Sequence, residues 1–163
     1  MRNASHLHLL AFVLCAVALT SRISAAAGPV VDARSARGLQ DLVDRLRAEL
    51  GIDASVSTEV VAANPLLVSV QPVRDDAASG FVMSFEERFL AGVDDDELRA
   101  IVAHELGHVW IFTHHPYLQT ERLANSVAMR AVTRAHLERV YSKVWERAGS
   151  KGDLAHFLGQ ERR

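Results

Sequence analysis

The spacing of hydrophobic residues predicts that the folded part of the chain begins with a helix and continues with short strands. In residues 35–50, leucine and valine recur at helical spacing between Leu39 and Leu50, and Gly51 follows as a stop signal. Residues 54–73 are instead rich in β-branched residues, which favours extended structure.

Three short strands are expected in this middle part of the chain. Asn64–Pro65 breaks the β-branched stretch, so its two halves are predicted to form a hairpin. Residues 74–80 form a polar connection, and "FVMSF" at 81–85 is the third strand candidate. Together these segments predict a small antiparallel sheet.

Helices are predicted for most of the remaining chain. Asp94 has a glutamate three positions later, a capping-box arrangement that starts a helix running to about Thr113. Pro116 marks the break after it, a second long helix is expected over 119–147, and a short one within 153–160. The expected fold class is therefore α+β, with the sheet packed on a helical layer and the capped helix followed by a long antiparallel helix.

The first 27 residues have the layout of a secretory signal peptide. An early arginine precedes an apolar run from Leu9 to Leu19, and the small residues Ala25–Ala27 offer a cleavage site. Because the apolar run is short for a membrane span, the expected mature chain is a single domain over 28–163 without a transmembrane span, secreted or periplasmic. Retention of the segment as a membrane anchor is the alternative, and lipid attachment at Cys15 is a weaker one because a bulky residue precedes it.

Composition narrows the class of function. Of the 163 residues, 49% are hydrophobic, which suits a compact domain. The formal net charge is −2 and no basic stripe stands out, which disfavours nucleic acid as a partner. Cys15 is the only cysteine of the sequence, so no disulfide is expected after signal cleavage.

A metal site is indicated by "HELGH", residues His104–His108. Histidines four positions apart lie on one face of a helix, where two imidazole nitrogens can converge on one zinc ion at about 2.0–2.1 Å. Glu105 lies about 100° further round the helix, so it flanks the ion within reach of a bound water molecule. The alternative is a buried helix whose histidines form hydrogen bonds with neighbouring side chains.

A catalytic zinc site needs a third protein ligand. A helix that continues beyond His108 would carry His114 about 120° away from the site and His115 about 10 Å along the axis. Glu121 is favoured over both, because the chain between His114 and Glu121 can span up to about 23 Å and return on a neighbouring helix. The alternative for Glu121 is a glutamate stabilised by the helix dipole. Asn125 lies on the same helical face and is expected to accept the Nδ1–H of a ligand histidine.

The motifs resemble those of the gluzincin zinc metallopeptidases, in which HExxH is followed by ExxA[DN] on a later helix. This chain has "HELGH" and then "ERLAN" at 121–125. Its "DDDELRAIVAHELGHV" is similar to the branch that contains the CAAX prenyl-protein endopeptidases and heat-shock membrane proteases, although the chain is more compact and without the membrane spans of that branch.

The resemblance implies a complete set of site residues: zinc ligands His104, His108 and Glu121, general base Glu105, and Asn125 in support of a ligand histidine. It also implies that the strand "GFVMSF" borders the cleft and pairs with an extended substrate peptide.

The expected function is peptide-bond hydrolysis by a zinc-dependent endopeptidase in an exported compartment. Zinc lowers the pKa of its bound water, and Glu105 takes the proton and passes it to the leaving amine. A further donor should stabilise the tetrahedral oxyanion, with four candidates in the sequence: His115, Arg130, His136 and Tyr141. The small size of the domain also leaves room for a partner protein, of unknown identity, that completes the cleft.

Two other classes of function are alternatives. One is a non-catalytic zinc-binding domain that acts as a binding or chaperone-like module in the envelope. Glu105 argues against it, because a structural site has no use for a carboxylate beside the metal and would offer four protein ligands. The other is a helical interaction protein without metal, which predicts no stoichiometric zinc.

Overall fold

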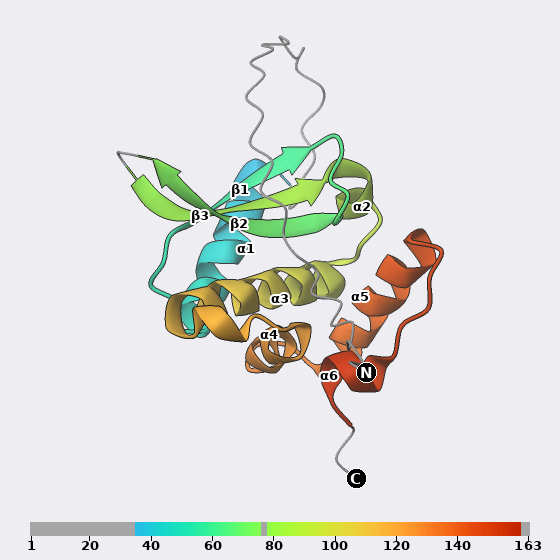
Figure 1. Cartoon of the computed structure of the whole chain (residues 1–163). Coiled ribbons are helices and arrows are strands. Elements are labelled where there is room, and N and C mark those ends of the chain that lie inside the picture. The colour runs from blue at the N-terminus through green and yellow to red at the C-terminus, as the bar shows by residue number, and fades with distance from the viewer. Residues whose placement is uncertain (1–34, 76–77, 161–163) are drawn as a thin grey trace, which may run out of the picture.

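The described part of the chain is a small sheet packed on helices, so the expected α+β class is confirmed (Figure 1). The computed structural model describes residues 35–75 and 78–160. In Figure 1 the sheet lies above helix α3 (Asp95–His114), and α4 (Glu121–Ala128) lies on the side of α3 away from the sheet. The predicted signal segment, residues 1–27, falls outside the described residues and stays a prediction.

Helix α1 (Ala36–Glu49) confirms the first predicted helix. The hydroxyl oxygen of Ser35 accepts a hydrogen bond from the Gly38 N–H (3.2 Å) and so caps the first turn. Its buried leucine and valine side chains form part of the core, and the helix packs against both the sheet and α3.

Three strands form a mixed sheet in the order β1–β3–β2. β1 (Val56–Val61) runs parallel to β3 (Ala78–Glu86), whereas β2 (Val68–Asp75) runs antiparallel to it. The sequence predicts an antiparallel sheet with a hairpin between the halves of 54–73, but the hairpin joins β2 to β3. The reason is burial: the alternate side chains of β3 from Phe81 to Phe85 are at most 8% exposed, so this strand takes the central position.

The central position of β3 corrects a second expectation. The resemblance implies that strand 80–85 pairs with an extended peptide, but β1 and β2 occupy the two edges of β3 between Phe81 and Phe85. No edge of this part of β3 is left for a substrate. The strand that packs against α3 with one edge unpaired by any other described strand is β2.

Helix α3 carries HELGH through the middle of the domain, and its start is as predicted. Oδ1 of Asp94 accepts the Glu97 N–H, and Oε2 of Glu97 accepts the Asp94 N–H, both at 2.8 Å. The short helix α2 (Glu87–Ala91) precedes it. α3 ends at His114, so both HELGH histidines lie well inside a regular helix.

The prediction of one long helix over 119–147 is wrong, because the structure has two helices there. α4 ends at Ala128, and α5 (Arg134–Arg147) begins after a turn over 129–133. Thr133 has an extended backbone, and its hydroxyl oxygen accepts the His136 N–H (3.3 Å), which starts the new helix.

Two further short helices are the 3-10 helix η1 (Pro116–Leu118), between α3 and α4, and α6 (Leu154–Leu158), after α5. Within residues 35–75 and 78–160, no helix meets the length and hydropathy that a membrane span requires.

Charged groups hold α5 against the start of α3 and the end of β3. Lys143 Nζ forms an ion pair with Glu97, whose side chain is almost fully buried. Nη2 of Arg147 lies 2.8 Å from Oε2 of Glu86, which is also buried. Each buried carboxylate therefore has a cation from α5, and Glu97 has a second one, because Nε of Arg139 lies 3.9 Å from its Oε1. These contacts fix the position of Tyr141 in the middle of α5.

Candidate metal centre

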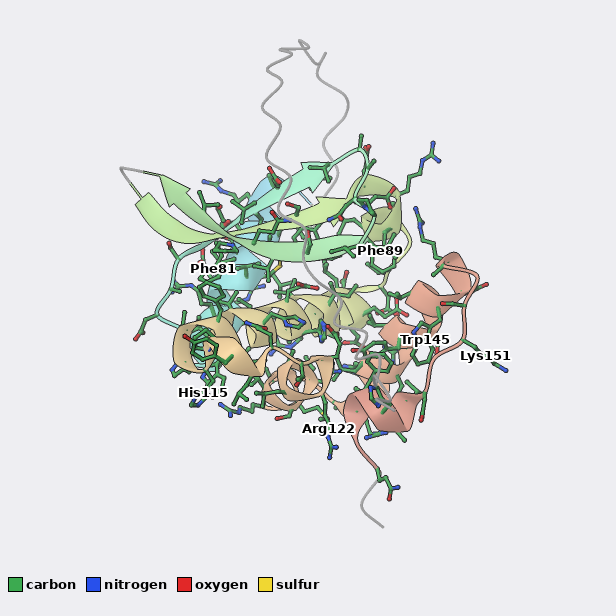
Figure 2. The ribbon with its side chains drawn as sticks, in the orientation of Figure 1. Phe81, Phe89, His115, Arg122, Trp145 and Lys151 are labelled. Atoms are coloured by element: carbon green, nitrogen blue, oxygen red, sulfur yellow. The ribbon has the colours of Figure 1, made fainter. Side chains whose placement is uncertain are left out.

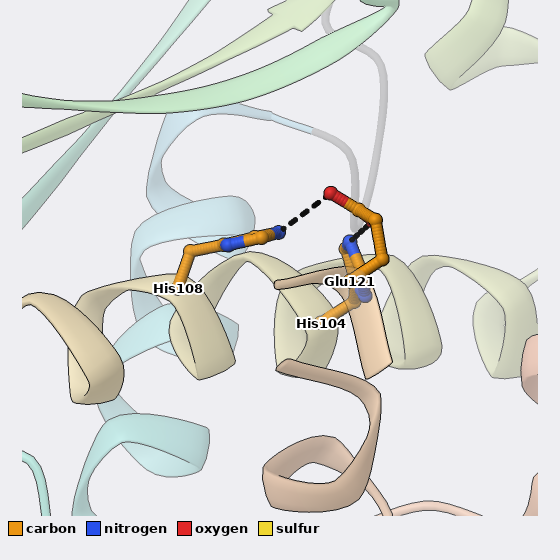
Figure 3. A group of neighbouring side chains, drawn as sticks. All are labelled: His104, His108 and Glu121. Atoms are coloured by element: carbon orange, nitrogen blue, oxygen red, sulfur yellow. Dashed lines mark ion pairs between the residues drawn. The ribbon is translucent and has the colours of Figure 1, made fainter. Parts of the chain in front are cut away.

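His104 and His108 of α3 direct their Nε2 atoms toward one carboxylate (Figure 3). His104 Nε2 lies 3.2 Å from Oε2 of Glu121, and His108 Nε2 lies 3.4 Å from Oε1 of the same side chain. One ligand atom from each residue lies within 4.8 Å of the other two. The structure therefore brings together the three side chains predicted to bind zinc.

The spacing of these donor atoms fits a zinc ion. Ligands about 2.1 Å from a tetrahedral zinc stand about 3.4 Å apart, which is close to both distances between the histidines and Glu121. Two imidazoles and one carboxylate also leave a fourth position open, as in catalytic zinc sites, whereas structural sites are closed by four protein ligands.

Helix α4 reaches the histidines because Gly107 has no side chain. A Cβ at Gly107 would stand 2.4 Å from the Ala124 carbonyl oxygen, so a larger residue would force the two helices apart. Oγ1 of Thr120 accepts the Leu123 N–H (3.2 Å) and caps α4, which makes Glu121 its first residue. Close packing of α4 on α3 thus places Glu121 over the two histidines.

Each histidine is held at its other ring nitrogen by a side-chain carbonyl. Nδ1 of His104 lies 2.8 Å from Oδ1 of Asn125, and Nδ1 of His108 lies 3.2 Å from Oε1 of Gln119. An amide oxygen can only accept, so both histidines carry a proton on Nδ1 and present Nε2 to a metal. Gln119 also donates from its Nε2 to the His108 carbonyl oxygen (3.3 Å), which fixes the orientation of its amide group.

Asn125 connects the histidines to a tyrosine on α5. Its side chain is fully buried, and Nδ2 donates to the Tyr141 hydroxyl (2.8 Å) and to the Phe157 carbonyl (3.1 Å). The Tyr141 hydroxyl in turn donates toward Oε2 of Glu121 at 3.4 Å. Burial raises the pKa of Tyr141, so its hydroxyl keeps its proton at neutral pH.

Glu105 lies beside the candidate ligands, next to the edge of β2. Burial raises the pKa of its carboxyl group, while His104, His108 and a hydrogen bond from the Val70 N–H lower it. The net upward shift suits a general base, which must take up a proton and then release it. The Val70 contact also locates β2 directly against the predicted reaction site.

His104, His108 and Glu121 form the candidate ligand group, and the carboxylates of Glu121 and Glu105 place negative charge next to the two histidines. Hydrogen bonds from His104 and His108 hold the pKa of Glu121 well below its usual range. Burial opposes the charged form of His108, but contacts with Glu121 and Glu105 outweigh it and raise its pKa. Such a site favours a bound cation.

Of the four candidate oxyanion donors, the structure places Tyr141 at the ligand group. His115 packs against the Trp110 ring, and Arg130 lies over that ring, 5.1 Å from its centroid. Trp110 is two positions beyond His108 and thus on the other side of the helix. Figure 2 shows His115 at the end of α3, far across the view from Trp145 of α5.

The remaining candidates also lie away from the ligand group. Nε2 of His136 is 3.8 Å from Asp96 in the first turn of α3, two helical turns before HELGH. His114, considered as a third ligand, stacks on Trp110 and directs Nδ1 at the Trp110 carbonyl oxygen (2.9 Å).

Three contributors to the site are missing from the sequence-based set: Gln119, Gly107 and the Val70 N–H. Glutamine is not a zinc ligand, and its contact with His108 depends on the path of the connection between α3 and α4. The glycine inside HELGH is a detectable signal, because glycine within a helix requires a packing reason. The Val70 contact depends on the strand order and has no signal in the sequence.

Comparison with known proteins gives one family and one structural likeness. The family model described as peptidase family M48 matches residues 35–160. The crystal structure of the metallopeptidase zymogen of Pyrococcus abyssi abylysin is similar over 71% of this chain and 99% of that chain, with 11% sequence identity and a TM-score of 0.49. No curated protein matches the chain.

Proposed function

The chain belongs to peptidase family M48 and is a zinc metalloprotease, and we propose that it is an endopeptidase that cleaves extended peptides in an exported compartment. The observation that carries the proposal is the convergence of His104 Nε2, His108 Nε2 and the Glu121 carboxylate, with Glu105 beside them. We assign the first three as metal ligands and Glu105 as the general base.

The side chains around the ligands have separate tasks in this mechanism. A zinc ion supplies a Lewis acid for the scissile carbonyl and acidifies a water molecule. Glu105 accepts the proton of the attacking water and returns it to the leaving amine. Tyr141 donates its O–H to the developing oxyanion, while the Asn125 amide donates to the tyrosine oxygen and so orients the hydroxyl proton away from itself.

The substrate is expected to lie along β2. This strand is at an edge of the sheet, packs against α3, and touches Glu105 through the Val70 N–H. An extended peptide that adds to this edge would bring its backbone to the ligand group. The substrate is therefore still expected to bind as an extended strand, but it pairs with β2 instead of β3.

Metal removal tests the proposed activity. Treatment with 1,10-phenanthroline should abolish hydrolysis of casein, and about one equivalent of zinc per chain should restore it. Hydrolysis that persists after complete removal of the metal would exclude the mechanism.

A pair of variants tests the third ligand. Glu121→Ala should weaken zinc binding, measured by competition with a chelator, on the order of 100-fold, because the site loses its only carboxylate ligand. Glu146→Ala removes an exposed glutamate of α5 and should leave the affinity unchanged. Equal affinities in the two variants would transfer the third-ligand role to another residue.

The exported location rests on residues 1–27 alone. N-terminal sequencing of the protein recovered from the periplasm or the medium should find a chain that begins after Ala26 or Ala27. Recovery of the protein only in the cytoplasm with its first residues intact would overturn this part of the proposal.

A further inference from the structure

The backbone groups on the free edge of β2 can be assigned from the ladder with β3. The Glu86 N–H donates to the Leu67 carbonyl oxygen (2.7 Å), so residue 67 faces β3. Since successive residues of a strand alternate in an antiparallel ladder, Val68, Val70 and Pro72 direct their backbone groups away from β3, toward the edge beside the metal ligands.

None of these three positions offers a free N–H, and each lacks it for a different reason. The Val68 N–H turns back to the Leu66 carbonyl oxygen (2.7 Å) around Leu67, which has a positive φ of 65°. The Val70 N–H is directed at the Glu105 carboxylate, whose pKa it lowers. Pro72 has no N–H at all.

The carbonyl oxygens at the same three positions, in contrast, accept no hydrogen bond from the described residues. Among the described residues, no second strand, turn or side chain pairs with the carbonyl oxygens of Val68, Val70 or Pro72. Val68 is buried, Val70 is partly exposed and Pro72 is exposed, so solvent or a ligand reaches this edge at Val70 and Pro72. The edge therefore presents acceptors at every second residue and no free donors.

We propose that β2 binds the substrate only through the substrate's own N–H groups, so that the protease requires an N–H at alternate substrate residues and excludes proline or N-alkylated residues there. This inference rests on the proposed endopeptidase function and on the placement of the peptide along β2. It assigns Val68, Val70 and Pro72 as specificity-determining residues through their backbone.

The requirement does not depend on the direction in which the substrate runs. In parallel and antiparallel pairing alike, the residues of the added strand that face β2 alternate with residues that face away. Loss of a facing N–H removes one hydrogen bond, whereas loss of an N–H on the other side removes none. The expected signature is therefore a sensitivity to backbone changes with a period of two.

A set of modified peptides tests the signature. The probe is a short quenched fluorogenic peptide taken from a casein segment that the zinc-loaded protein cleaves, resynthesised with a single ester in place of an amide at each position outside the scissile bond. An ester removes the N–H and keeps the chain length. At facing positions kcat/KM should fall about two- to tenfold, the value of one hydrogen bond, and at the intervening positions it should stay within twofold.

A complementary variant adds the donor that the edge lacks. Pro72→Val supplies an N–H on the free edge of β2. This donor should lower KM for the unmodified peptide about two- to tenfold. Gln71→Val is the matched control, because it introduces the same side chain where the backbone faces β3 and adds no edge donor. Melting temperatures of both variants show whether the strand is intact.

The outcomes separate this inference from the proposed function. Cleavage by the wild type with equal effects at all ester positions, or with no gain for an intact Pro72→Val over Gln71→Val, would overturn the inference and leave the endopeptidase function standing. Failure of the wild type to cleave any peptide would overturn both.

Discussion

At the residue scale, Asn125 has the largest number of tasks in the site. Its oxygen fixes the tautomer of His104, and its nitrogen holds the Tyr141 hydroxyl and the Phe157 carbonyl. A buried amide with all these partners is rigid, since any rotation would leave polar groups unpaired in the interior. The precise position of His104 and of the Tyr141 hydroxyl thus depends on the same side chain.

Removal of the Tyr141 hydroxyl distinguishes two roles of that group, donation to the oxyanion and donation to Glu121. If it donates to the oxyanion, Tyr141→Phe should lower kcat by about 10²–10³-fold with zinc affinity nearly unchanged. The measurement is steady-state kinetics together with zinc competition. Tyr117→Phe is the matched control, because Tyr117 is 97% exposed. A loss of zinc affinity with unchanged kcat in the loaded protein would show that the hydroxyl serves Glu121 instead.

The clustering of the candidate ligands could be predicted from the sequence because their spacing follows helix geometry. His104, Glu105 and His108 share one helix, and Glu121 and Asn125 are four residues apart on the next, so each group needs only the helical repeat. Gln119 could not be found in this way, since it lies in the connection between the helices and reaches His108 only through the path of the folded chain.

At the scale of elements, the approach of α4 to α3 is the most sensitive contact. Gly107→Ala should raise stability if helix propensity decided the outcome, because alanine favours a helix by about 1 kcal/mol over glycine. A Cβ there would meet the backbone of Ala124 at 2.4 Å, so we expect a loss of about 1–3 kcal/mol and weaker zinc binding as α4 carries Glu121 away.

Chemical denaturation and zinc competition measure both effects. Gly92→Ala is the control, since a Cβ at Gly92 meets its nearest atom at an ordinary 3.5 Å. Stability and zinc affinity equal to the wild type in Gly107→Ala would show that the helices are not in close contact.

The cap of α3 gives a pH-dependent contribution to stability. The hydrogen bond from the Glu97 N–H lowers the pKa of Asp94 below its ordinary value of 3.8, with Arg139 and Lys143 adding to the effect. A carboxylate with a lowered folded-state pKa stabilises the fold above the unfolded-state pKa, and that stability disappears as the pH falls through the folded-state pKa.

Asp94→Asn retains a capping oxygen but cannot titrate. We expect the wild type to melt at a higher temperature than Asp94→Asn at neutral pH, and the difference to shrink as the pH falls below 3.8. Both proteins should be free of metal during calorimetry, so that protonation of the zinc ligands does not contribute. A difference that stays constant with pH would contradict the assignment.

Elements were predictable where local signals decide them, and less so where tertiary packing decides. Asp94 and its glutamate partner define the start of α3 by adjacent residues alone. The order of the strands depends on which strand buries its side chains most deeply in the core, and this requires knowledge of what packs on the sheet. The end of α4 was a missed local signal, because Thr133 is a favoured N-cap residue within an otherwise helical pattern.

At the scale of the whole molecule, the site depends on segments that are far apart in the sequence. α3 supplies both histidines and Glu105, α4 supplies Glu121, and α5 supplies Tyr141. Ion pairs of Lys143 and Arg147 with two buried glutamates hold α5 in place. Since zinc would link α3 to α4 only in the folded protein, its binding stabilises the whole domain.

The proposed mechanism requires Glu105 to act as the base at a zinc ion held by His104, His108 and Glu121. The most direct test compares the wild type with Glu105→Gln for zinc content and casein hydrolysis, because the substitution removes the base and keeps the size of the side chain. We expect one zinc per chain in both proteins and a loss of activity of about 10³-fold or more in Glu105→Gln. Equal activity of the two proteins, or the absence of stoichiometric zinc from both, would contradict it.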